Sequence, residues 1–494
     1  MNPPRHNELI GKNPHIVEKH RGYNPPLGIL FLGTYLQEHS DHEVELMDCQ
    51  PPEWSYDELE KILAGKKADI VGITAMTFTL IDVKLLVETI KKVNPDCKIV
   101  LGGPHVHIYP EETLRLPGVD FIMQGEGEKA FLQFLNAYPD TAKLREVQGL
   151  AYFDKDGTYV NNKIATNTTE LDELGYPRRE LLDYRRYSSL LGRANMITTM
   201  FTSRGCPFRC TFCDRPYSPT ISGFRWRSAA HVADEMEACL KLGIGEAVIY
   251  DDTFTVRKDR VFELCDEIKK RGLKFKWDIR AHVNTITEDL LAAMKSAGCD
   301  RIHYGVECGN DRMMKVIRKN TTVEKVKLAT QWTKQAGIEV LTYFIIGQQT
   351  EKREDIQDTM RLAQELDPNY AHFTVFCPYP ATEIYQMGLD TGVIKSDVWK
   401  QFAQDPKPGF ELPLWEENFT RYELQEMLVE AYKSFYTRPG YIIRNLKRVR
   451  SYGELKRKVK AGISVLTMKP NLPRGAMAAK VHDVVPGASY DVST

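Results

Sequence analysis

The sequence predicts an α/β protein with a doubly wound N-terminal domain, a partial (β/α)6 barrel and a mostly helical C-terminal extension. Three observations support this prediction. The chain has 494 residues, which exceeds what one compact core usually holds. Strand-like and helix-like segments alternate over residues 27–136 and again, in longer units, from residue 196, a pattern typical of parallel sheets covered by helices. Residues after 400 lose this alternation.

The N-terminal domain is expected over residues 1–140, where apolar runs of strand length are separated by helical patterns. The predicted strands are Val44–Met47, Asp69–Thr74, Lys98–Leu101 and Val119–Met123, and the predicted helices are Tyr56–Leu63 and Ile81–Val93. A doubly wound domain normally opens with a buried apolar strand, and none precedes Pro3 and Pro4. We therefore expect the true start codon to lie upstream of Met1.

A linker is expected over residues 141–195, with a short hairpin beginning at Gly149–Phe153. The barrel is expected over 196–400 and the helical extension over 401–494. The predicted barrel strands are Met196–Thr202, Ala247–Tyr250, Phe275–Ile279, Arg301–Gly305, Glu339–Ile346 and Ala371–Phe376, with helices at 229–241, 258–271, 287–297, 322–335 and 352–366. Loops at the C-terminal ends of such strands usually carry the chemistry.

Charge and hydropathy narrow the choice of partners. The 66 basic and 67 acidic residues give a formal charge of −1, so no global basic field for nucleic acid is present. No run of about 20 apolar residues and no secretory signal are visible, which predicts a cytoplasmic protein. Tyr441–Lys460 holds eight basic residues and one acid, and predicts a basic amphipathic helix. Two positions are considered for this helix. It lies near the active-site mouth or an anionic membrane surface, or it packs on the barrel as a solvated helix.

The strongest chemical signal is a cluster of three cysteines, Cys206, Cys210 and Cys213, directly after the first barrel strand. Three thiolates on one short loop can hold a [4Fe–4S] cluster and leave one iron open. A structural zinc ion is the alternative, but zinc requires four ligands, and the next candidates in sequence are His231 and Cys239. Cys239, Cys265 and Cys299 are expected to be small core residues, whereas Cys377 ends a strand at the active face.

The C-x3-C-x2-C spacing, with Phe212 before the last cysteine, resembles the signature of the radical S-adenosylmethionine (radical SAM) family. The resemblance implies that the open iron chelates S-adenosylmethionine. It also implies that an electron from an external donor, such as flavodoxin or ferredoxin, cleaves this cofactor to methionine and a 5′-deoxyadenosyl radical.

Further segments resemble the family's cofactor-binding positions in the expected order. Tyr304–Gly309 contains Glu307, Phe344–Gly347 contains Ile346 at the adenine border, and Pro378–Thr382 follows the sixth strand. Asp251 and Asp252 follow the second strand, where many members have Gly-Gly-Glu, so the resemblance implies that their carboxylates reach the methionyl ammonium. Three residues after the third strand are candidates to touch substrate or cofactor: Asp278, Arg280 and His282. His303 is expected to be a satisfied interior histidine.

The N-terminal domain resembles a cobalamin-binding domain. Thr74 and Met76 occupy the Ser and Leu positions of its S-x-L motif, Gly102 and Gly103 match its paired glycines, and the following loop contains Gly125 and Glu126. The D-x-H-x-x-G motif is absent, and His105 and His107 follow a different strand. The resemblance therefore implies cobalamin without a histidine below the cobalt. The alternative is a relic domain that binds no corrinoid.

Together these features predict a cobalamin-dependent radical SAM methyltransferase that acts on an unactivated carbon of a small-molecule or lipid substrate. A second hypothesis is an oxidative cyclase or a carbon–carbon bond-forming enzyme, because the architecture also resembles the anaerobic magnesium-protoporphyrin monomethyl ester cyclases. A third is a non-catalytic corrinoid- or metal-binding protein.

Overall fold

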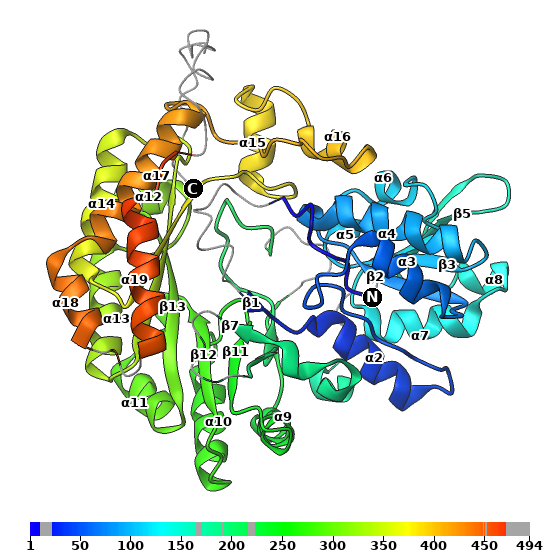
Figure 1. Ribbon diagram of the computed structural model, residues 1–494, viewed down its shortest axis with the longest axis horizontal. Coiled ribbons are helices and arrows are strands. Elements are labelled where there is room, and N and C mark those ends of the chain that lie inside the picture. Colours follow the sequence, from blue (N-terminus) through cyan, green and yellow to red (C-terminus); the bar gives the residue numbers. More distant parts are fainter. Residues whose placement is uncertain are drawn as a thin grey trace.

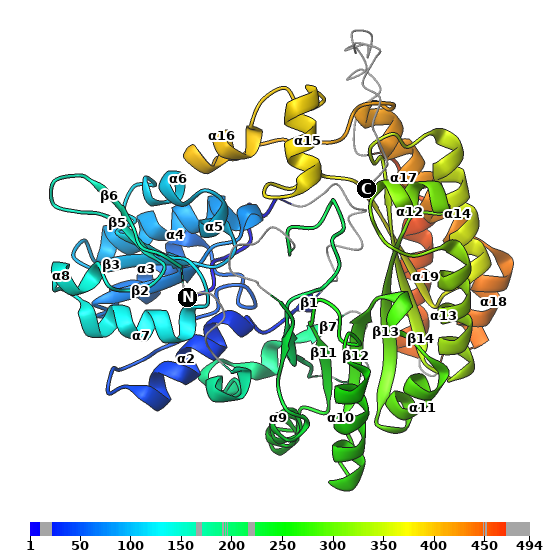
Figure 2. The same ribbon diagram turned by 180° about the vertical axis from the view of Figure 1, so that it is seen from behind.

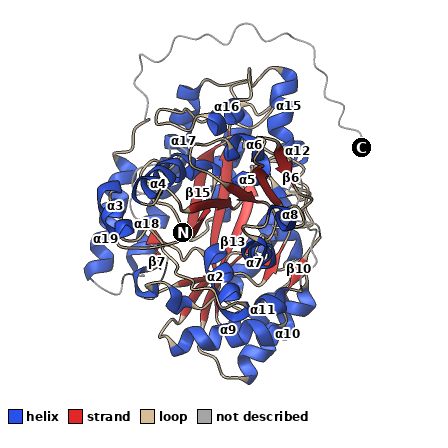
Figure 3. Ribbon diagram, turned by 90° about the vertical axis from the view of Figure 1, so that its right-hand side faces the viewer, coloured by secondary structure: helices blue, strands red, loops and turns tan. Residues whose placement is uncertain are grey.

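A computed structural model describes residues 1–9, 22–164, 170–189, 192, 194, 196–215, 223–447, 449 and 452–470. Figures 1 and 2 show two α/β bodies that face each other, with α15 and α16 spanning one side of the gap between them. Figure 3 shows the strands of both bodies enclosed by helices. This arrangement confirms the predicted α/β class and its two sheet-containing parts.

The described strands of the first body form a five-stranded sheet in the order β2-β3-β4-β5-β6. The strands are β2 (Ile70–Thr74), β3 (Lys98–Gly102), β4 (Phe121–Met123), β5 (Leu150–Phe153) and β6 (Tyr159–Asn161). The first three are parallel, and β4 pairs antiparallel with β5. The predicted hairpin therefore exists, but it extends the first sheet. The assignment of residues 141–161 to the linker is wrong.

Both faces of this sheet are covered, as a doubly wound domain requires. Along β3 the side chains alternate: Ile99 and Leu101 join one core cluster, and Val100 joins another. The first cluster lies under α3 (Tyr56–Ala64), α4 (Leu80–Val93), α5 (His105–Ile108) and α6 (Pro110–Leu114), and the second under α2 (Leu27–His39), α7 (Gly127–Ala137) and α8 (Thr141–Leu144). Helix α3 begins with a capping box between Ser55 and Glu58.

Val44–Met47 does not form the predicted strand, although the structure describes all of it. It lies beside Met1 and Asn2, and the next two residues, Pro3 and Pro4, have no N–H group to donate to a ladder. Asn2 N–H donates to the Met47 carbonyl at 2.9 Å, and Thr74 N–H donates to the Met1 carbonyl at 3.1 Å. A single parallel bridge joins Asn2 to Asp48. The expected upstream start codon stays a prediction.

The second body is built on six described parallel strands in the order β15-β14-β13-β12-β11-β8. They are β8 (Thr198–Met200), β11 (Glu246–Ile249), β12 (Lys276–Ala281), β13 (Cys299–Glu307), β14 (Glu339–Ile346) and β15 (Tyr370–Val375). The intervening helices are α9 (Ala229–Lys241), α10 (Lys258–Lys270), α11 (Glu288–Ser296), α12 (Asp311–Val316), α13 (Val323–Gln335) and α14 (Arg353–Leu366). The partial barrel is confirmed, and Cys239, Cys265 and Cys299 are buried in its core as expected.

The chain then leaves the barrel and crosses to the first body. Helices α15 (Glu383–Thr391) and α16 (Val398–Gln404) follow β15. Trp399 and Phe402 of α16 are buried in the same core cluster as α3 and α4, and Tyr109 donates a hydrogen bond to Asp397 at 3.0 Å. The sequence analysis placed all residues up to 400 in the barrel. That boundary is wrong, because α15 and α16 lie outside the barrel.

Three helices complete the described chain: α17 (Arg421–Tyr436), α18 (Pro439–Lys447) and α19 (Tyr452–Leu466). Tyr441 donates to the carbonyl of Asn369, which precedes β15, and Arg444 pairs with Asp367. Helix α18 thus lies at the N-terminal edge of the barrel strands, opposite the cysteine loop. Of the two alternatives for this segment, α18 supports packing on the barrel and not a position near the active-site mouth. Arg448, Arg450 and Ser451 lie outside the described residues, and no described helix is long and apolar enough to span a bilayer.

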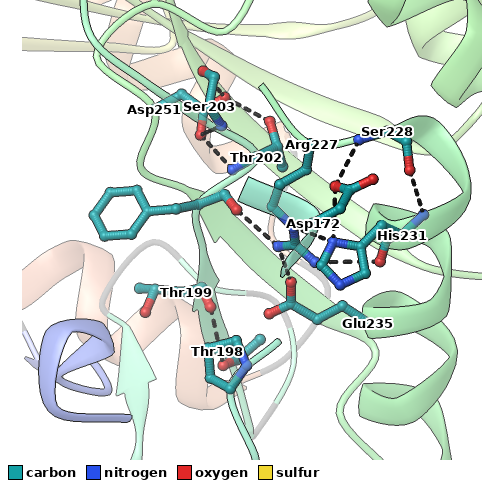
Figure 4. A network of polar contacts seen from close by, with 12 residues as sticks. Asp172, Thr198, Thr199, Thr202, Ser203, Arg227, Ser228, His231, Glu235 and Asp251 are labelled. Atoms are coloured by element: carbon teal, nitrogen blue, oxygen red, sulfur yellow. Dashed lines mark hydrogen bonds and ion pairs between the residues drawn. The ribbon is translucent and has the colours of Figure 1, made fainter. Parts of the chain in front are cut away.

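The segment between the two bodies is fixed by a buried ion network, of which Figure 4 shows the pair of Arg227 and Glu235. Glu235 on α9 is fully buried and pairs with Arg179 at 2.5 Å and with Arg227. Arg227 also donates to the Phe201 carbonyl at the end of β8, and Arg179 donates to the Thr199 carbonyl. One carboxylate therefore ties the connecting segment and α9 to the first barrel strand.

Glu235→Gln should lower the free energy of unfolding by about 3–5 kcal/mol, because it leaves two buried guanidinium groups without a counter-charge. Urea unfolding followed by circular dichroism measures this change. The matched control is Asp259→Asn, which removes an exposed partner of Arg257 and should change stability little. Equal effects of the two substitutions would contradict the role assigned to Glu235.

Candidate cluster and cofactor site

The start of the cysteine loop is held by Asp251, which follows β11. Its buried carboxylate accepts hydrogen bonds from Thr202 N–H at 2.6 Å and Oγ1 at 2.5 Å, and from Ser203 N–H at 3.0 Å and Oγ at 2.5 Å (Figure 4). Arg260 donates to the Thr202 carbonyl at 3.0 Å. Both carboxylate oxygens of Asp251 are occupied by these hydrogen bonds, so Asp251 positions the loop. Its carboxylate is therefore not free for the contact with the methionyl ammonium that the sequence analysis expected.

The rest of the loop is anchored at three points, at the end of α12, on α15 and after β12. Thr211 N–H donates to the Ile317 carbonyl at 3.2 Å, and the Thr211 carbonyl accepts from Ile384 N–H at 3.1 Å. Phe208 stacks on His282, with ring centroids 3.9 Å apart. The loop is thus fixed at the C-terminal ends of the strands, where the sequence predicts the chemistry.

The three cysteines differ in exposure: Cys210 is buried, whereas Cys206 and Cys213 are partly exposed. Burial raises the pKa of Cys210, and it raises that of Cys213 to about 12, with the neighbouring cysteines adding to both shifts. A bound metal cluster supplies the positive charge that three adjacent thiolates need. The donor set and its position therefore fit a [4Fe–4S] cluster.

The zinc alternative finds no support. Ligands of a single zinc ion converge on one point at about 2.3 Å for sulfur and 2.0 Å for nitrogen. Within the described residues, no three Cys, His, Asp or Glu side chains are placed to hold one metal ion.

Charged pairs surround the cysteines. Lys319 donates to Glu307 at 2.8 Å, both side chains are buried, and the Lys319 ammonium lies 5.8 Å from the Phe212 ring centroid. Asp252 pairs with Arg215 at 3.2 Å, and burial raises the pKa of Asp252 although Arg215 opposes the shift. Glu307 and Asp252 thus both lie beside the cysteine loop, as the sequence predicts.

The strand that the sequence assigns to the adenine border ends in a tight turn. Ile346 is buried at the end of β14, and Gly347 adopts a positive φ of 82°. Glu351 accepts hydrogen bonds from Gly347 N–H at 2.5 Å and Gln348 N–H at 2.9 Å, and burial raises its pKa to about 7. Glu351 therefore fixes the backbone of this turn.

In the first body, the predicted cobalamin residues gather at the carboxyl ends of the parallel strands. Thr74 ends β2, Gly102 ends β3, and Gly125 follows β4. Gly103 has a φ of +95°, and a Cβ there would lie 2.8 Å from the Ala75 carbonyl oxygen and 2.9 Å from Thr74 Oγ1. Only glycine fits this close approach, and ligands of doubly wound domains bind at this edge.

Two histidines beside this edge carry buried ring nitrogens without a hydrogen-bond partner, Nε2 of His105 and Nδ1 of His107. Burial lowers the pKa of His105 to about 3 and that of His107 to about 4, so both rings are neutral. Thr77 and Gly125 contact the other nitrogens, at 3.0 Å and 3.4 Å. The glycine edge and the unpartnered polar atoms fit a large ligand with polar groups, such as cobalamin.

The two sites are joined by Arg204, which immediately precedes Gly205 and Cys206. Arg204 pairs with Glu126 at 3.0 Å and with Glu128 at 2.6 Å, and Arg225 also pairs with Glu126. Burial raises the pKa of Glu126, but the two arginines lower it more, so this pKa lies below its ordinary value. Glu126 is therefore a link between the bodies. Sequence reasoning missed Arg204, although its place next to the first cysteine was a signal.

Comparison with known proteins identifies both bodies. The radical SAM superfamily model matches residues 200–363, and the B12 binding domain model matches residues 15–135. An uncharacterized methyltransferase (PH0819) of Pyrococcus horikoshii is 32% identical over 427 residues, which cover 85% of this chain and 90% of the relative. The chain belongs to the cobalamin-binding radical SAM family. It is a radical SAM enzyme, and the cofactors of its family are a [4Fe–4S] cluster, S-adenosylmethionine and cobalamin.

Other relatives extend the comparison. An anaerobic magnesium-protoporphyrin IX monomethyl ester cyclase of Rubrivivax gelatinosus is 28% identical, over 85% of this chain and 75% of the relative. The radical SAM methyltransferase TsrM of Kitasatospora setae, solved with cobalamin and a [4Fe–4S] cluster, has a TM-score of 0.67 and 17% identity, covering 85% and 88% of the two chains. The cobalamin-dependent radical SAM enzyme OxsB has a TM-score of 0.69 and 20% identity, covering 91% and 70%. The last two comparisons show the shared fold.

For this radical SAM enzyme, Asp251→Asn and Asp252→Asn should have different effects. Asp251→Asn replaces one acceptor oxygen of the loop anchor by a donor, so the iron and sulfide content per chain after reconstitution should fall by at least about half. Asp252→Asn should keep the cluster and weaken binding of S-adenosylmethionine, measured by equilibrium dialysis. A full cluster content in Asp251→Asn would contradict the positioning role.

Proposed function

We propose that the enzyme transfers a methyl group to an unactivated carbon of a small-molecule substrate. One observation carries this proposal: Arg204 joins the loop of the three cysteines to the loop after β4, so the residues expected to hold the two cofactors face each other. When bound, the cluster and S-adenosylmethionine supply a carbon-centred radical, and cobalamin supplies the methyl group. The methyltransferase relative supports the same reaction class.

The chain's residues position and shield these groups. In the proposal, Cys206, Cys210 and Cys213 hold the cluster. Asp252, Glu307 and Ile346 border S-adenosylmethionine. The corrinoid lies against Thr74, Met76, Gly102, Gly103 and Gly125. Helices α15 and α16 connect the barrel to the first body and, in the proposal, help to exclude water from reactive species.

The proposal includes an external electron donor, such as flavodoxin or ferredoxin, and a reducing compartment such as the cytoplasm, which keeps the three thiols free to bind iron. A lipid substrate or a peripheral membrane contact would have to use the exposed side chains Ile442, Ile443 and Leu446 of α18. These lie at the edge of the barrel opposite the cysteine loop, which favours a substrate that enters from solution.

The competing function is oxidative cyclisation, which the cyclase relative favours. The two reactions differ in product mass: methyl transfer adds one CH₂ to the substrate, whereas oxidative ring closure removes hydrogen. Anaerobic incubation of the reconstituted enzyme with S-adenosylmethionine and cell extract, followed by mass spectrometry, should detect the added CH₂. A product that has only lost hydrogen would replace methylation by cyclisation.

Cys206→Ala, Cys210→Ala and Cys213→Ala should each reduce formation of 5′-deoxyadenosine from S-adenosylmethionine to background, because three thiolates are the minimum that anchors the cluster. Liquid chromatography of quenched reactions measures the nucleoside. Cys239→Ala is the matched control, since this thiol is buried in the barrel core. Wild-type nucleoside formation in any of the three ligand variants would refute the cluster assignment.

The cobalt of the bound cobalamin should have no protein histidine below it. EPR of the cob(II)alamin form should then lack superhyperfine splitting from a histidine nitrogen, since the D-x-H-x-x-G motif is absent. His105→Ala and His107→Ala are the controls, because they remove the histidines beside the glycine edge. A nitrogen splitting that disappears in either variant would contradict the prediction, and no cobalamin uptake would favour a relic domain.

A further inference from the structure

The inner face of the barrel sheet carries an arginine, Arg280, that forms no ion pair with a carboxylate of the described residues. On β12, Trp277 and Ile279 are buried in the core beneath the helices. Because side chains alternate along a strand, Asp278 and Arg280 lie on the opposite, inner face. Arg280 is partly exposed there, and its guanidinium lies over the Tyr250 ring, 4.3 Å from the centroid.

Other charges on and near this face are paired. One layer below, Arg301 pairs with Asp278 at 2.8 Å and with Glu339 at 2.9 Å. Toward the cysteine loop, Glu307 pairs with Lys319 and Asp252 with Arg215. Among the described residues, no carboxylate lies within 4.0 Å of the Arg280 guanidinium. Asp252, which pairs with Arg215, is the carboxylate that interacts with Arg280 electrostatically from a longer distance.

Neutral polar side chains surround that charge. Arg280 is in register with His303 on β13, and one layer above, Gly305 is in register with Tyr343, which faces His372 on β15. His303 Nδ1 is 3.0 Å from the Tyr343 hydroxyl, whereas its buried Nε2 has no partner within hydrogen-bond distance and lies 3.9 Å from Asp278 Oδ2. Burial lowers the pKa of His303, and that of His372 to about 4, so both rings are neutral hydrogen-bonding groups at pH 7.

The layer that contains Arg280 lies next to the loop of the three cysteines. Arg280 is one residue from the end of β12, and His282, two residues further, stacks on Phe208 of the cysteine loop. A group bound by Arg280 would therefore lie directly below that loop, on the inner side of the barrel.

We propose that this inner face binds a carboxylate or phosphate group of the substrate, with Arg280 as counter-ion. A guanidinium presents two parallel N–H donors that match the oxygens of either anion. Binding of the anion orients the substrate, so that a nearby carbon faces the cluster. The inference rests on the proposed function and narrows it, because the substrate becomes an anionic organic molecule instead of a neutral lipid.

The test measures binding of inorganic phosphate and of glutarate to the anaerobic enzyme, loaded with cluster and cobalamin, by isothermal titration calorimetry. Arg280→Gln should weaken binding of at least one of the two anions about tenfold or more, and Arg280→Lys should recover part of that loss because it keeps the charge but not the paired donors. Arg257→Gln is the matched control. It removes the same charge from an exposed arginine that already pairs with Asp259, and should leave anion binding unchanged.

Three outcomes would overturn the proposal. The first is equal affinity of wild type and Arg280→Gln for both anions. The second is no measurable binding of either anion to the wild type. The third is a tenfold loss of S-adenosylmethionine affinity in Arg280→Gln without competition from phosphate or glutarate, which would assign Arg280 to the methionyl carboxylate. If Arg280→Gln does not fold, Arg280→Lys and Tyr343→Phe provide the same comparison. This test measures anion binding and not product mass. The anion site can therefore be confirmed even if product analysis shows cyclisation instead of methylation.

Discussion

The ion pairs of Arg204 with Glu126 and Glu128 connect the two bodies at the place where both sets of predicted cofactor residues lie. The arginine comes from the start of the cysteine loop, and the carboxylates come from the loop after β4 and the beginning of α7. Each side alone would leave partly buried charges without partners, which is costly away from water. Satisfying them requires the carboxyl edge of the first sheet to face the cysteine loop of the barrel.

This contact places the cofactor residues at opposing strand ends, and the other anchors act within that frame. Asp251 fixes where the chain leaves β8, and Phe208 stacks on the edge of β12, so the loop of the three cysteines is held from below. Gly103 keeps the facing edge free of side-chain bulk. Below the loop, the inner barrel face changes from paired charges around Arg301 to the unpaired cation of Arg280. A molecule bound there would lie between a fixed anion-binding layer and the loop of the cysteines.

Much of the barrel could be predicted from the sequence because strand-like segments alternate regularly with helical patterns, as a parallel sheet covered by helices requires. The cysteine loop was predicted from spacing alone. Local patterns fail where the partner is distant in sequence. Val44–Met47 has the composition of a strand but no continuous neighbour, the hairpin at Leu150–Asn161 completes a sheet begun 80 residues earlier, and α16 buries Trp399 in the other body. The roles of Arg204 and Asp251, and the unpaired state of Arg280, depend on contacts across elements, and no periodicity reports such contacts.

Anomalous diffraction at the iron and cobalt edges from the reconstituted enzyme tests the central claim most directly. The account predicts an iron peak bounded by Cys206, Cys210 and Cys213, and a cobalt peak between the Gly102–Gly103 edge and the cysteine loop, on the side where Arg204 joins the two bodies. Iron outside the three cysteines, or cobalt bound away from that edge, would contradict the account.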